Sequence, residues 1–320
     1  MTSPSRHYLD FERPIGDVEA KIEELSKLAE TAGSNAMYPE IAALRERVRD
    51  LRREAYADLD AWRKTQVARH PDRPHFADYV RALIDDFVEL RGDRQFGDDQ
   101  AIVGGLGRFR GVPVMVMGHE KGCSTAERIK HNFGMGMPEG YRKAVRLMDM
   151  AERFGLAVLT FVDTAGAYPG IGAEERGQGE AIARSTERGL TLGVPMIATI
   201  TGEGGSGGAL ALAAANRVLI LEHSIYSVIA PESGSSILFR DRSQAPQMAR
   251  SMKITAQDLI GFGVIDRIVP EPEGGAHADR AATIDAVGDA IEGELKVLSD
   301  LPPEALRRQR AERFYAIGRS

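Results

Sequence analysis

The chain has 320 residues, of which 43% are hydrophobic and 28% charged, so it is a globular protein of one or two domains rather than a disordered, collagenous or membrane chain. Its 41 basic and 47 acidic side chains give a formal net charge of -6, which disfavours a basic nucleic-acid binder. A single cysteine, Cys123, excludes an internal disulfide and the usual structural zinc sites, which need two or more cysteines.

Two amphipathic helices are predicted near the N-terminus. Apolar residues with the three- and four-residue spacing of a helix run from Val18 to Ala29 and, after a linker over residues 31–39, from Ile41 to Leu59. We expect these helices to form a hairpin that serves packing or oligomerisation. Two prolines then break the pattern and place the boundary between a helical extension, residues 1–75, and a main domain, residues 76–320.

Short apolar runs alternate with helical segments in the main domain, which predicts a mostly parallel sheet covered by helices on both faces. Residues 101–109 and 111–119 are expected to form a β-hairpin. Further strands are predicted at 156–162, 194–200, 217–222, 225–230 and 264–269, and helices at 144–154, 174–189, 207–215, 278–297 and 303–315.

A glycine-rich segment, Gly202 to Gly208, follows the strand at 194–200 and leads into a helix. Glycines leave backbone N–H groups uncovered, and the first turn of a helix adds donors that have no intrahelical partner. The segment therefore predicts a pocket for an anion or a developing oxyanion. Close packing of the helix against the strand is an equally good reading of the same glycines.

Two other motifs overlap this segment. Gly202, Gly204 and Gly207 match a dinucleotide-binding fingerprint, with Glu222 placed 20 residues further on, which makes a nucleotide-binding dehydrogenase the alternative function. Against it, that fingerprint belongs to the first strand-helix-strand unit of a domain, whereas at least three predicted strands precede it here. No lysine follows the glycines, so ATP hydrolysis at this loop is not expected.

A nucleophile elbow is the third pattern in the segment. Gly204, Ser206 and Gly208 have its spacing, with Ser206 as the nucleophile of an esterase. His223 and His277 follow downstream as possible bases. No acid with a distinctive context lies between them, so this alternative comes last.

A second glycine-containing turn, residues 163–170, closes the strand at 156–162. Asp163 stands at the carboxyl end of that strand, where open α/β sheets place ligands, although capping of the turn is at least as good a reading. Tyr168 and Pro169 are expected to form a flat apolar wall. Two such turns facing one crevice favour chemistry that depends on backbone donors.

The segment from Lys121 to Arg146 carries six basic residues against two glutamates. We expect part of it to form a cradle for a coenzyme A phosphate or for an acidic partner surface. Only His131 and Phe133 offer stacking groups, so RNA binding is not expected. Cys123 has basic neighbours that favour its thiolate, but no base accompanies it and no role is assigned. The cradle residues are Lys121, Arg128, Lys130, His131 and Arg142.

The segments IVGGLGRFRGVPVMVMGHEKG, RIKHNFGM, FVDTAGAYPGIGAEERGQGEAIAR and GEGGSGGALALA are similar to those of a known family. Over nearly its whole length, and in the same order, the chain resembles the carboxyltransferase alpha subunits of acetyl-CoA carboxylases from bacteria and plastids. Two positions depart from the family pattern. Ala165 stands where proline is usual, and Gly234 replaces a cysteine.

The resemblance implies a crotonase-like α/β fold, a spiral of ββα units with an N-terminal helical extension. It implies an alpha subunit that pairs with a zinc-bearing beta subunit in an α2β2 assembly and holds no metal itself. Together they would transfer a carboxyl group from carboxybiotin, on a biotin carboxyl carrier protein, to acetyl-CoA, giving malonyl-CoA for fatty-acid synthesis. ATP would be used by the partner biotin carboxylase. The sequence itself has no charged segment followed by an apolar run at its start and no apolar run long enough to cross a bilayer. We therefore expect a cytoplasmic protein without membrane partners, and its net charge disfavours nucleic-acid partners.

The resemblance also implies roles for particular residues. Gly207 and Gly208 would form an oxyanion hole on the biotin side, while Gly204 and Gly205 would shape the approach to it. The hole for the acyl-CoA would come largely from the beta subunit, so the active site would be shared. Substrate-binding residues would be Tyr168, Pro169 and Gly170 along the cleft, and Lys121, Arg128, Lys130 and Arg142 towards coenzyme or carrier.

Overall fold

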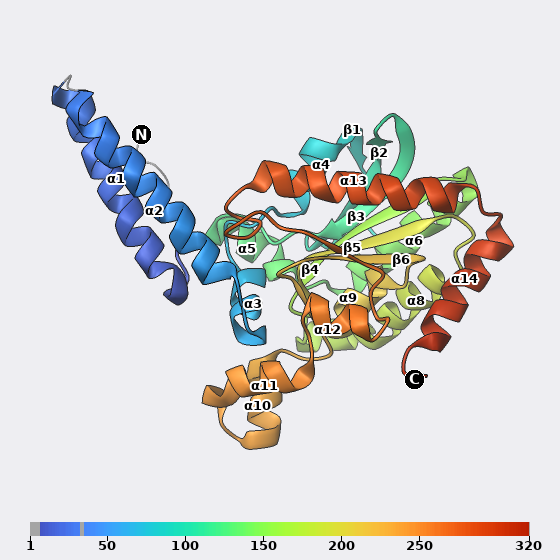
Figure 1. The fold of residues 1–320 in the computed structure, drawn as a ribbon. Helices are drawn as coiled ribbons and strands as arrows, with labels where there is room; N and C mark the ends of the chain where they lie inside the picture. Colours follow the sequence, from blue (N-terminus) through green and yellow to red (C-terminus); the bar gives the residue numbers. More distant parts are fainter. Residues whose placement is uncertain (1–6, 33–34, 320) are drawn as a thin grey trace.

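The computed structural model describes residues 7–32 and 35–319, and it places a mixed α/β body beside an N-terminal helical hairpin (Figure 1). Residues 1–6 and Ser320 of the expected domain ranges, and Gly33 and Ser34 of the expected linker, lie outside the described residues. None of the described helices combines the length and the apolar character needed to cross a bilayer.

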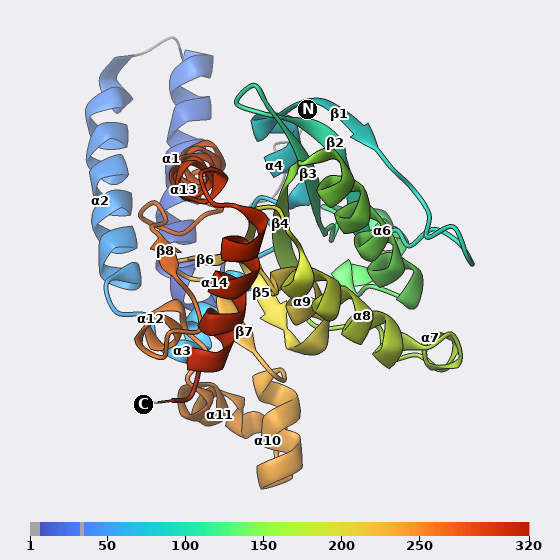
Figure 2. The same cartoon turned by 90° about the vertical axis from the view of Figure 1, so that its right-hand side faces the viewer.

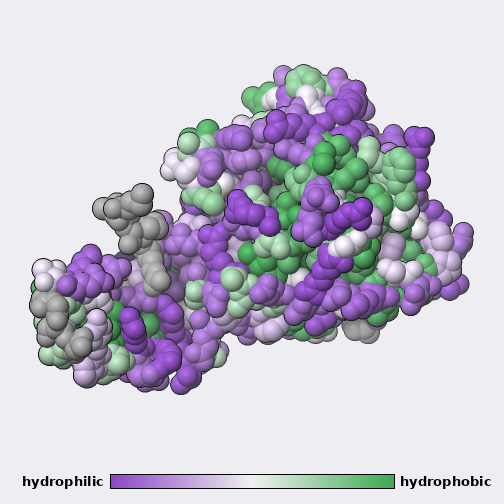
Figure 3. All heavy atoms as spheres, turned by 90° about the horizontal axis from the view of Figure 1, so that it is seen from above, coloured by the Kyte–Doolittle hydropathy of each residue, from purple (hydrophilic) through white to green (hydrophobic). Residues whose placement is uncertain are grey.

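The hairpin consists of α1 (Arg13–Ala32) and α2 (Tyr38–Tyr56), which pack against each other as the apolar spacing predicts. The second helix ends three residues earlier than expected. The carboxylate of Asp60 caps a new helix, α3 (Ala61–Ala68), by accepting a hydrogen bond from the Arg63 amide at 2.8 Å. From above, the hairpin presents mainly hydrophilic residues, and the larger apolar areas lie over the main body (Figure 3). The boundary at residue 75 stays a prediction.

Eight strands form one sheet in the order β1-β2-β3-β4-β5-β6-β8, and β7 pairs with β5 beyond this path. The pairs β1–β2 and β2–β3 are antiparallel, which confirms the hairpin, and all pairs from β3 onward are parallel. The strands are β1 (Ile84–Glu89), β2 (Ile102–Phe109), β3 (Val112–His119), β4 (Ala157–Thr164), β5 (Met196–Gly205), β6 (Arg217–Leu221), β7 (Ile225–Ser227) and β8 (Arg267–Val269).

Alternate residues of the central strands enter two different apolar cores. In β4, Val158 and Val162 face one group of helices, namely α6 (Pro138–Phe154), α8 (Gln178–Thr191) and α9 (Ser206–Ala213). Leu159 and Phe161 face another group, namely α4 (Phe76–Leu83), α13 (Arg280–Ser299) and α14 (Pro303–Ala316). This alternation is the period of two that a strand buried on both faces requires. Figure 2 shows α6, α8 and α9 on one side of the sheet and α13 and α14 on the other.

Helices precede the first strand, connect the strands and follow the last one. The helix expected at 174–189 is divided, because Gly177 adopts a left-handed conformation with φ of 79° between α7 and α8. The helices α10 and α11 extend away from the sheet (Figure 1). Bounds are α4 (Phe76–Leu83), α5 (Thr125–Lys130), α6 (Pro138–Phe154), α7 (Ile171–Glu175), α8 (Gln178–Thr191), α9 (Ser206–Ala213), α10 (Pro231–Phe239), α11 (Ala245–Met252), α12 (Ala256–Gly261), α13 (Arg280–Ser299) and α14 (Pro303–Ala316), with short 3-10 helices at Asp10–Glu12, Asn35–Met37, Asn132–Gly134 and Arg242–Gln244.

Candidate active site

The junction of β5 and α9 differs from the expected glycine-rich turn. Residues 202–205 continue the strand, and Gly204 pairs with both Thr164 of β4 and Tyr226 of β7. The glycines are needed for close approach, because a Cβ on Gly205 would overlap the carbonyl group of Ala165. The chain turns only at Ser206, which has a strained φ of 52° and begins α9.

The first turn of α9 contains the two glycines expected to form an oxyanion hole. The amides of Gly207 and Gly208 lie in this turn, where backbone amides have no acceptor within the helix. Gly208 packs on the second glycine-containing turn, since a Cβ there would lie 2.6 Å from the Ala167 nitrogen. Gly207 borders an apolar groove of about 600 Å³ that also includes Tyr226 and Met248. The junction of β5 and α9 therefore contacts the turn that follows β4, and the amides of the first turn of α9 lie beside this contact.

Asp163, near the end of β4, forms hydrogen bonds close to this contact. Its Oδ1 accepts hydrogen bonds from Lys121 Nζ at 2.6 Å and from the Glu203 amide at 2.9 Å. Burial alone would raise the pKa of Asp163, but the Lys121 ammonium and the amide outweigh it and hold the pKa below its usual value. The carboxylate is thus ionised, and its hydrogen-bond partners are Lys121 and the Glu203 amide of β5 rather than the next amides of its own turn. Asp163 therefore links the two neighbouring strands instead of capping the turn, whose Gly166 amide donates to Thr164 Oγ1.

The end of the second turn is fixed by main-chain contacts. Tyr168 donates its amide hydrogen to the Gly136 carbonyl at 3.0 Å, and its own carbonyl accepts from Gln178 Nε2 at 2.9 Å. A side chain on Gly170 would overlap the Tyr168 ring. Pro169 is exposed and Tyr168 is half-buried, so both remain accessible to a ligand.

The structure does not bring the four expected cations of the basic segment together. Lys121 and Arg128 line a pocket of about 210 Å³ beside Ala165 of the second turn. Lys130 lines a different pocket on the other side of α5. Arg142 lies on α6, where it donates to the Arg176 carbonyl and faces Asp93 at 3.7 Å.

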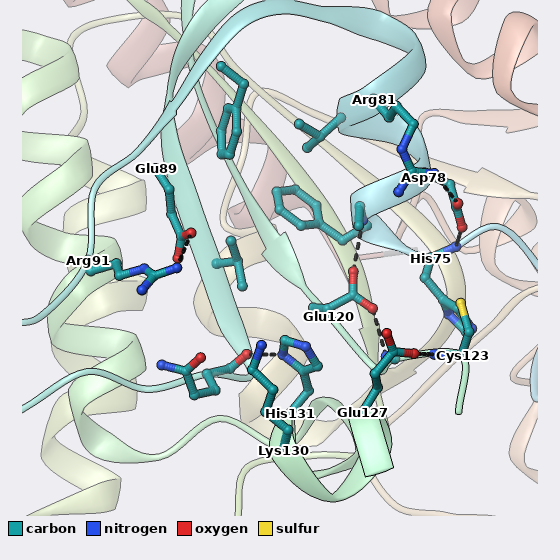
Figure 4. A pocket seen from close by; sticks show the side chains of 17 residues that line it. His75, Asp78, Arg81, Glu89, Arg91, Glu120, Cys123, Glu127, Lys130 and His131 are labelled. Carbon is teal, nitrogen blue, oxygen red and sulfur yellow. Dashed lines mark hydrogen bonds and ion pairs between the residues drawn. The ribbon is translucent and has the colours of Figure 1, made fainter. Parts of the chain in front are cut away.

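The second pocket has a volume of about 370 Å³ and an apolar floor that includes Phe76 and Val103. Figure 4 shows Lys130 and His131 at its rim, together with Glu120, Glu127 and Cys123. The basic neighbours of Cys123 in the sequence do not lower the pKa of its thiol. Burial, together with the carboxylates of Asp78 and Glu120, raises the pKa of the Cys123 thiol.

The alternative motifs have other placements. Gly202 and Gly204 lie inside β5 rather than in a turn, and one carboxylate oxygen of Glu222 accepts a hydrogen bond from the Glu271 amide at 3.1 Å. The glycines are therefore not in the strand-to-helix turn that a dinucleotide fingerprint requires. Among the described residues, the groove at Ser206 is lined by no histidine and no carboxylate. A catalytic triad at that serine therefore lacks its base and its acid.

A histidine cluster that sequence spacing did not predict joins the hairpin to the main body. Ligand atoms of Glu12, His70 and His277 lie within 4.8 Å of one another. The two imidazole rings stack with centroids 3.7 Å apart and planes 12° apart, and both ring nitrogens of His70 contact the main chain. Two stacked rings cannot both direct a lone pair at one ion, so the cluster does not suit a metal. It is better explained as a set of contacts that hold the N-terminal segment against the main body.

Residues 8–318 match the family described as acetyl co-enzyme A carboxylase carboxyltransferase-like. The chain belongs to this family. It is 73% identical over 314 residues to acetyl-coenzyme A carboxylase carboxyl transferase subunit alpha of Caulobacter vibrioides strain NA1000 / CB15N, with 98% of each chain covered. Its identity to the subunit of the same name from Rhodopseudomonas palustris strain BisA53 is 61% over 319 residues, covering 100% and 99% of the two chains. The chain is thus a carboxyltransferase subunit.

Solved structures confirm the expected crotonase-like fold. A Pseudomonas malonate decarboxylase hetero-tetramer in complex with coenzyme A has a TM-score of 0.56 at 18% identity, over 69% of this chain and 89% of that one. Transcarboxylase 12S has a TM-score of 0.55 at 19% identity, over 69% and 41%. At these identities the likeness establishes the architecture alone.

Proposed function

We propose that this chain is the alpha subunit of an acetyl-CoA carboxylase carboxyltransferase, which moves a carboxyl group from carboxybiotin to acetyl-CoA and forms malonyl-CoA for fatty-acid synthesis. The observation that carries the proposal is the position of the amides of Gly207 and Gly208, which lie in the first turn of α9, where Gly208 packs on the second turn. The sequence identity to named alpha subunits supports it.

The reaction requires stabilised oxyanions. When the bond between the ureido nitrogen and the carboxyl carbon breaks, CO2 leaves and the electron pair stays on the ureido group, whose oxygen gains negative charge. The ureido nitrogen then takes a proton from the acetyl methyl group, and the enolate attacks CO2 to form the new carbon–carbon bond. We assign the ureido oxygen to the amides of Gly207 and Gly208, because fixed donors need no reorientation as charge develops.

The other residues of the site would bind the substrates and shape the cleft. Gly204 and Gly205 let the strand approach the second turn, and Tyr168, Pro169 and Gly170 would line the cleft. We assign Lys121 and Arg128 to the substrate side, since both line the pocket at Ala165. Lys130 and Arg142 point elsewhere and are not assigned to this site.

The proposed partners follow from the same reaction. A zinc-bearing beta subunit would complete the site in an α2β2 assembly and supply most of the hole for the acyl-CoA. A biotin carboxyl carrier protein would deliver carboxybiotin, and a biotin carboxylase would use ATP to make it. This chain itself would hold no metal, and the complex would act in the cytoplasm.

Reconstitution tests the proposal. The chain, a beta subunit and their mixture are each assayed for malonyl-CoA formation from carboxybiotin and acetyl-CoA. We expect transfer only from the mixture. Full activity from this chain alone would refute the shared site, and no transfer from a stable mixture would refute the assigned function.

A further inference from the structure

The pocket beside Ala165, here named the Arg128 pocket, adjoins the proposed site, and the chemical group that it binds is not yet assigned. Its walls come from the loop after α3, from α5 and the turn that follows, and from the end of β4. Ala165 at its edge belongs to the turn that contacts Gly205. The lining residues used below are Arg69, His75, Lys121, Arg128, Phe133 and Ala165.

Two of the three cations in the Arg128 pocket already have partners. Lys121 is paired with Asp163, and Arg69 donates to Glu203 at 2.6 Å and to Glu232 at 2.5 Å. Arg128 is half-buried, and its guanidinium forms no ion pair or hydrogen bond with any residue that the structure describes. A half-buried arginine without a counter-charge is suited to bind an anionic oxygen group through two hydrogen bonds.

Phe133 is held at the same pocket by an uncommon backbone conformation. Asn132 and Phe133 have φ values of 48° and 55°, in the left-handed region that side chains larger than glycine rarely adopt. The next residue, Gly134, lies so close to β4 that a Cβ would be 2.8 Å from the Asp163 carbonyl oxygen. The turn is thereby pressed against the sheet while the Phe133 side chain stays 50% exposed, available to pack on a flat ring.

His75 supplies a third group at this pocket. Its side chain is 5% exposed, and Nδ1 has no hydrogen-bond partner among the described residues. Because Nδ1 is itself shielded from solvent, it is an unpaired atom within the pocket wall and is not offered to a ligand.

We infer that the Arg128 pocket binds a flat heterocycle that carries an anionic oxygen group, with Arg128 on the anion and Phe133 against the ring. The choice of ligand rests on the proposed function, whose two substrates share this chemistry. One source is the carboxylated ureido ring of carboxybiotin, and the other is the phosphorylated adenosine of acetyl-CoA. Carboxybiotin would place its reacting carboxyl group near the second turn, whereas the acetyl group of acetyl-CoA would lie at the far end of the pantetheine arm.

The test compares Arg128→Gln and Phe133→Ala with matched controls in the reconstituted complex. Arg153→Gln and Phe154→Ala remove an exposed arginine and an exposed phenylalanine at the end of α6, which leads into the opposite end of β4. KM and kcat are measured for acetyl-CoA, for its 3′-dephospho analogue and for the carboxylated carrier. Acetyl-CoA and biocytin are also titrated by calorimetry, and circular dichroism checks folding.

We expect Arg128→Gln to raise the KM for one substrate at least about tenfold while kcat changes less, and Phe133→Ala to raise the same KM. If the anion is the phosphate, the preference for acetyl-CoA over its 3′-dephospho analogue disappears in Arg128→Gln. If it is the carboxylate, only the KM for the carrier rises. Both controls should match the unaltered complex.

Unchanged KM values for every substrate in both variants would overturn the inference while leaving the proposed function intact. If the unaltered complex transfers nothing, the proposed function fails, and the titrations still decide about the pocket. Weaker binding of acetyl-CoA to Arg128→Gln than to Arg153→Gln, or of biocytin to Phe133→Ala than to Phe154→Ala, would then support it. Equal binding in both comparisons would overturn it.

Discussion

Asp163 is the residue on which the candidate site depends most for its shape. It is buried, and it holds both the Lys121 ammonium and the Glu203 amide. Replacing it in Asp163→Asn leaves a largely buried ammonium without its counter-charge, so we expect a loss of about 3–5 kcal/mol in the free energy of unfolding. Urea denaturation of the full chain measures this.

The double variant Lys121→Met/Asp163→Asn is the matched control for that change. It removes both charges together, so part of the lost stability should return. If the double variant is as unstable as the sum of the two single variants, the pair is not the source of the effect.

His119 predicts how the stability of the fold depends on pH. The side chain is 1% exposed, and burial lowers its pKa to about 4. In the unfolded chain the histidine has an ordinary pKa of about 6.5, so between these two values it binds a proton that it does not bind in the folded chain. Its contribution to stability is therefore fully present above about pH 6.5 and is lost as the pH falls towards 4. We expect His119→Met to reduce the slope of unfolding free energy against pH by about 1.4 kcal/mol per unit in this window. Equal slopes in urea titrations from pH 4.5 to 7 would contradict the account.

Contact between two elements, the turn after β4 and the strand before α9, forms the proposed site. In Gly205→Ala the new Cβ would overlap the Ala165 carbonyl, so the turn must move. We expect kcat of the reconstituted complex to fall by about 100-fold, of the order seen when one oxyanion donor is lost. Gly179→Ala in α8 is the control, because nothing lies within 4 Å of its Cβ position. Similar kcat values for the two variants would argue against the contact.

Periodicity predicted the elements whose residues follow one clear pattern. The β2–β3 hairpin and β4 have continuous apolar runs, and the meeting of the two turns follows because neighbouring parallel strands end at the same edge. The edge strand β1 was missed, since its two adjacent aspartates, Asp85 and Asp86, hide its alternation. The extension of β5 to Gly205 was missed because glycine is a poor strand former, and only the packed neighbours explain it.

Element geometry also explains why the expected basic cradle divides. Arg128 and Lys130 are two residues apart in α5, which places them about 200° apart around the helix axis. They therefore point into different pockets. The sequence revealed the number of charges, but assigning them to one face required knowing that this short segment is helical.

At the scale of the whole molecule, polar contacts join the N-terminal segments to the sheet. Arg73 is 1% exposed and donates to both carboxylate oxygens of Glu271 at 2.9 Å and to the Thr201 carbonyl. Nearby, Arg53 and Glu273 form an exposed pair at 3.2 Å. We expect Arg73→Met to lower the unfolding free energy by about 3–5 kcal/mol and Arg53→Gln by no more than about 1 kcal/mol. Both full-length variants are unfolded with denaturant. Comparable losses of unfolding free energy in the two would show that burial does not determine how much an ion pair contributes to stability.

We propose that peptide amides at the start of α9 stabilise the charge that develops on the ureido oxygen. The most direct measurement is a crystal structure of the assembled alpha and beta subunits with biotin bound. We predict that the ureido oxygen lies about 2.7–3.1 Å from the amide nitrogen of Gly207 or Gly208. An oxygen bound elsewhere, with both amides hydrogen-bonded within the protein or facing bulk solvent, would contradict the account.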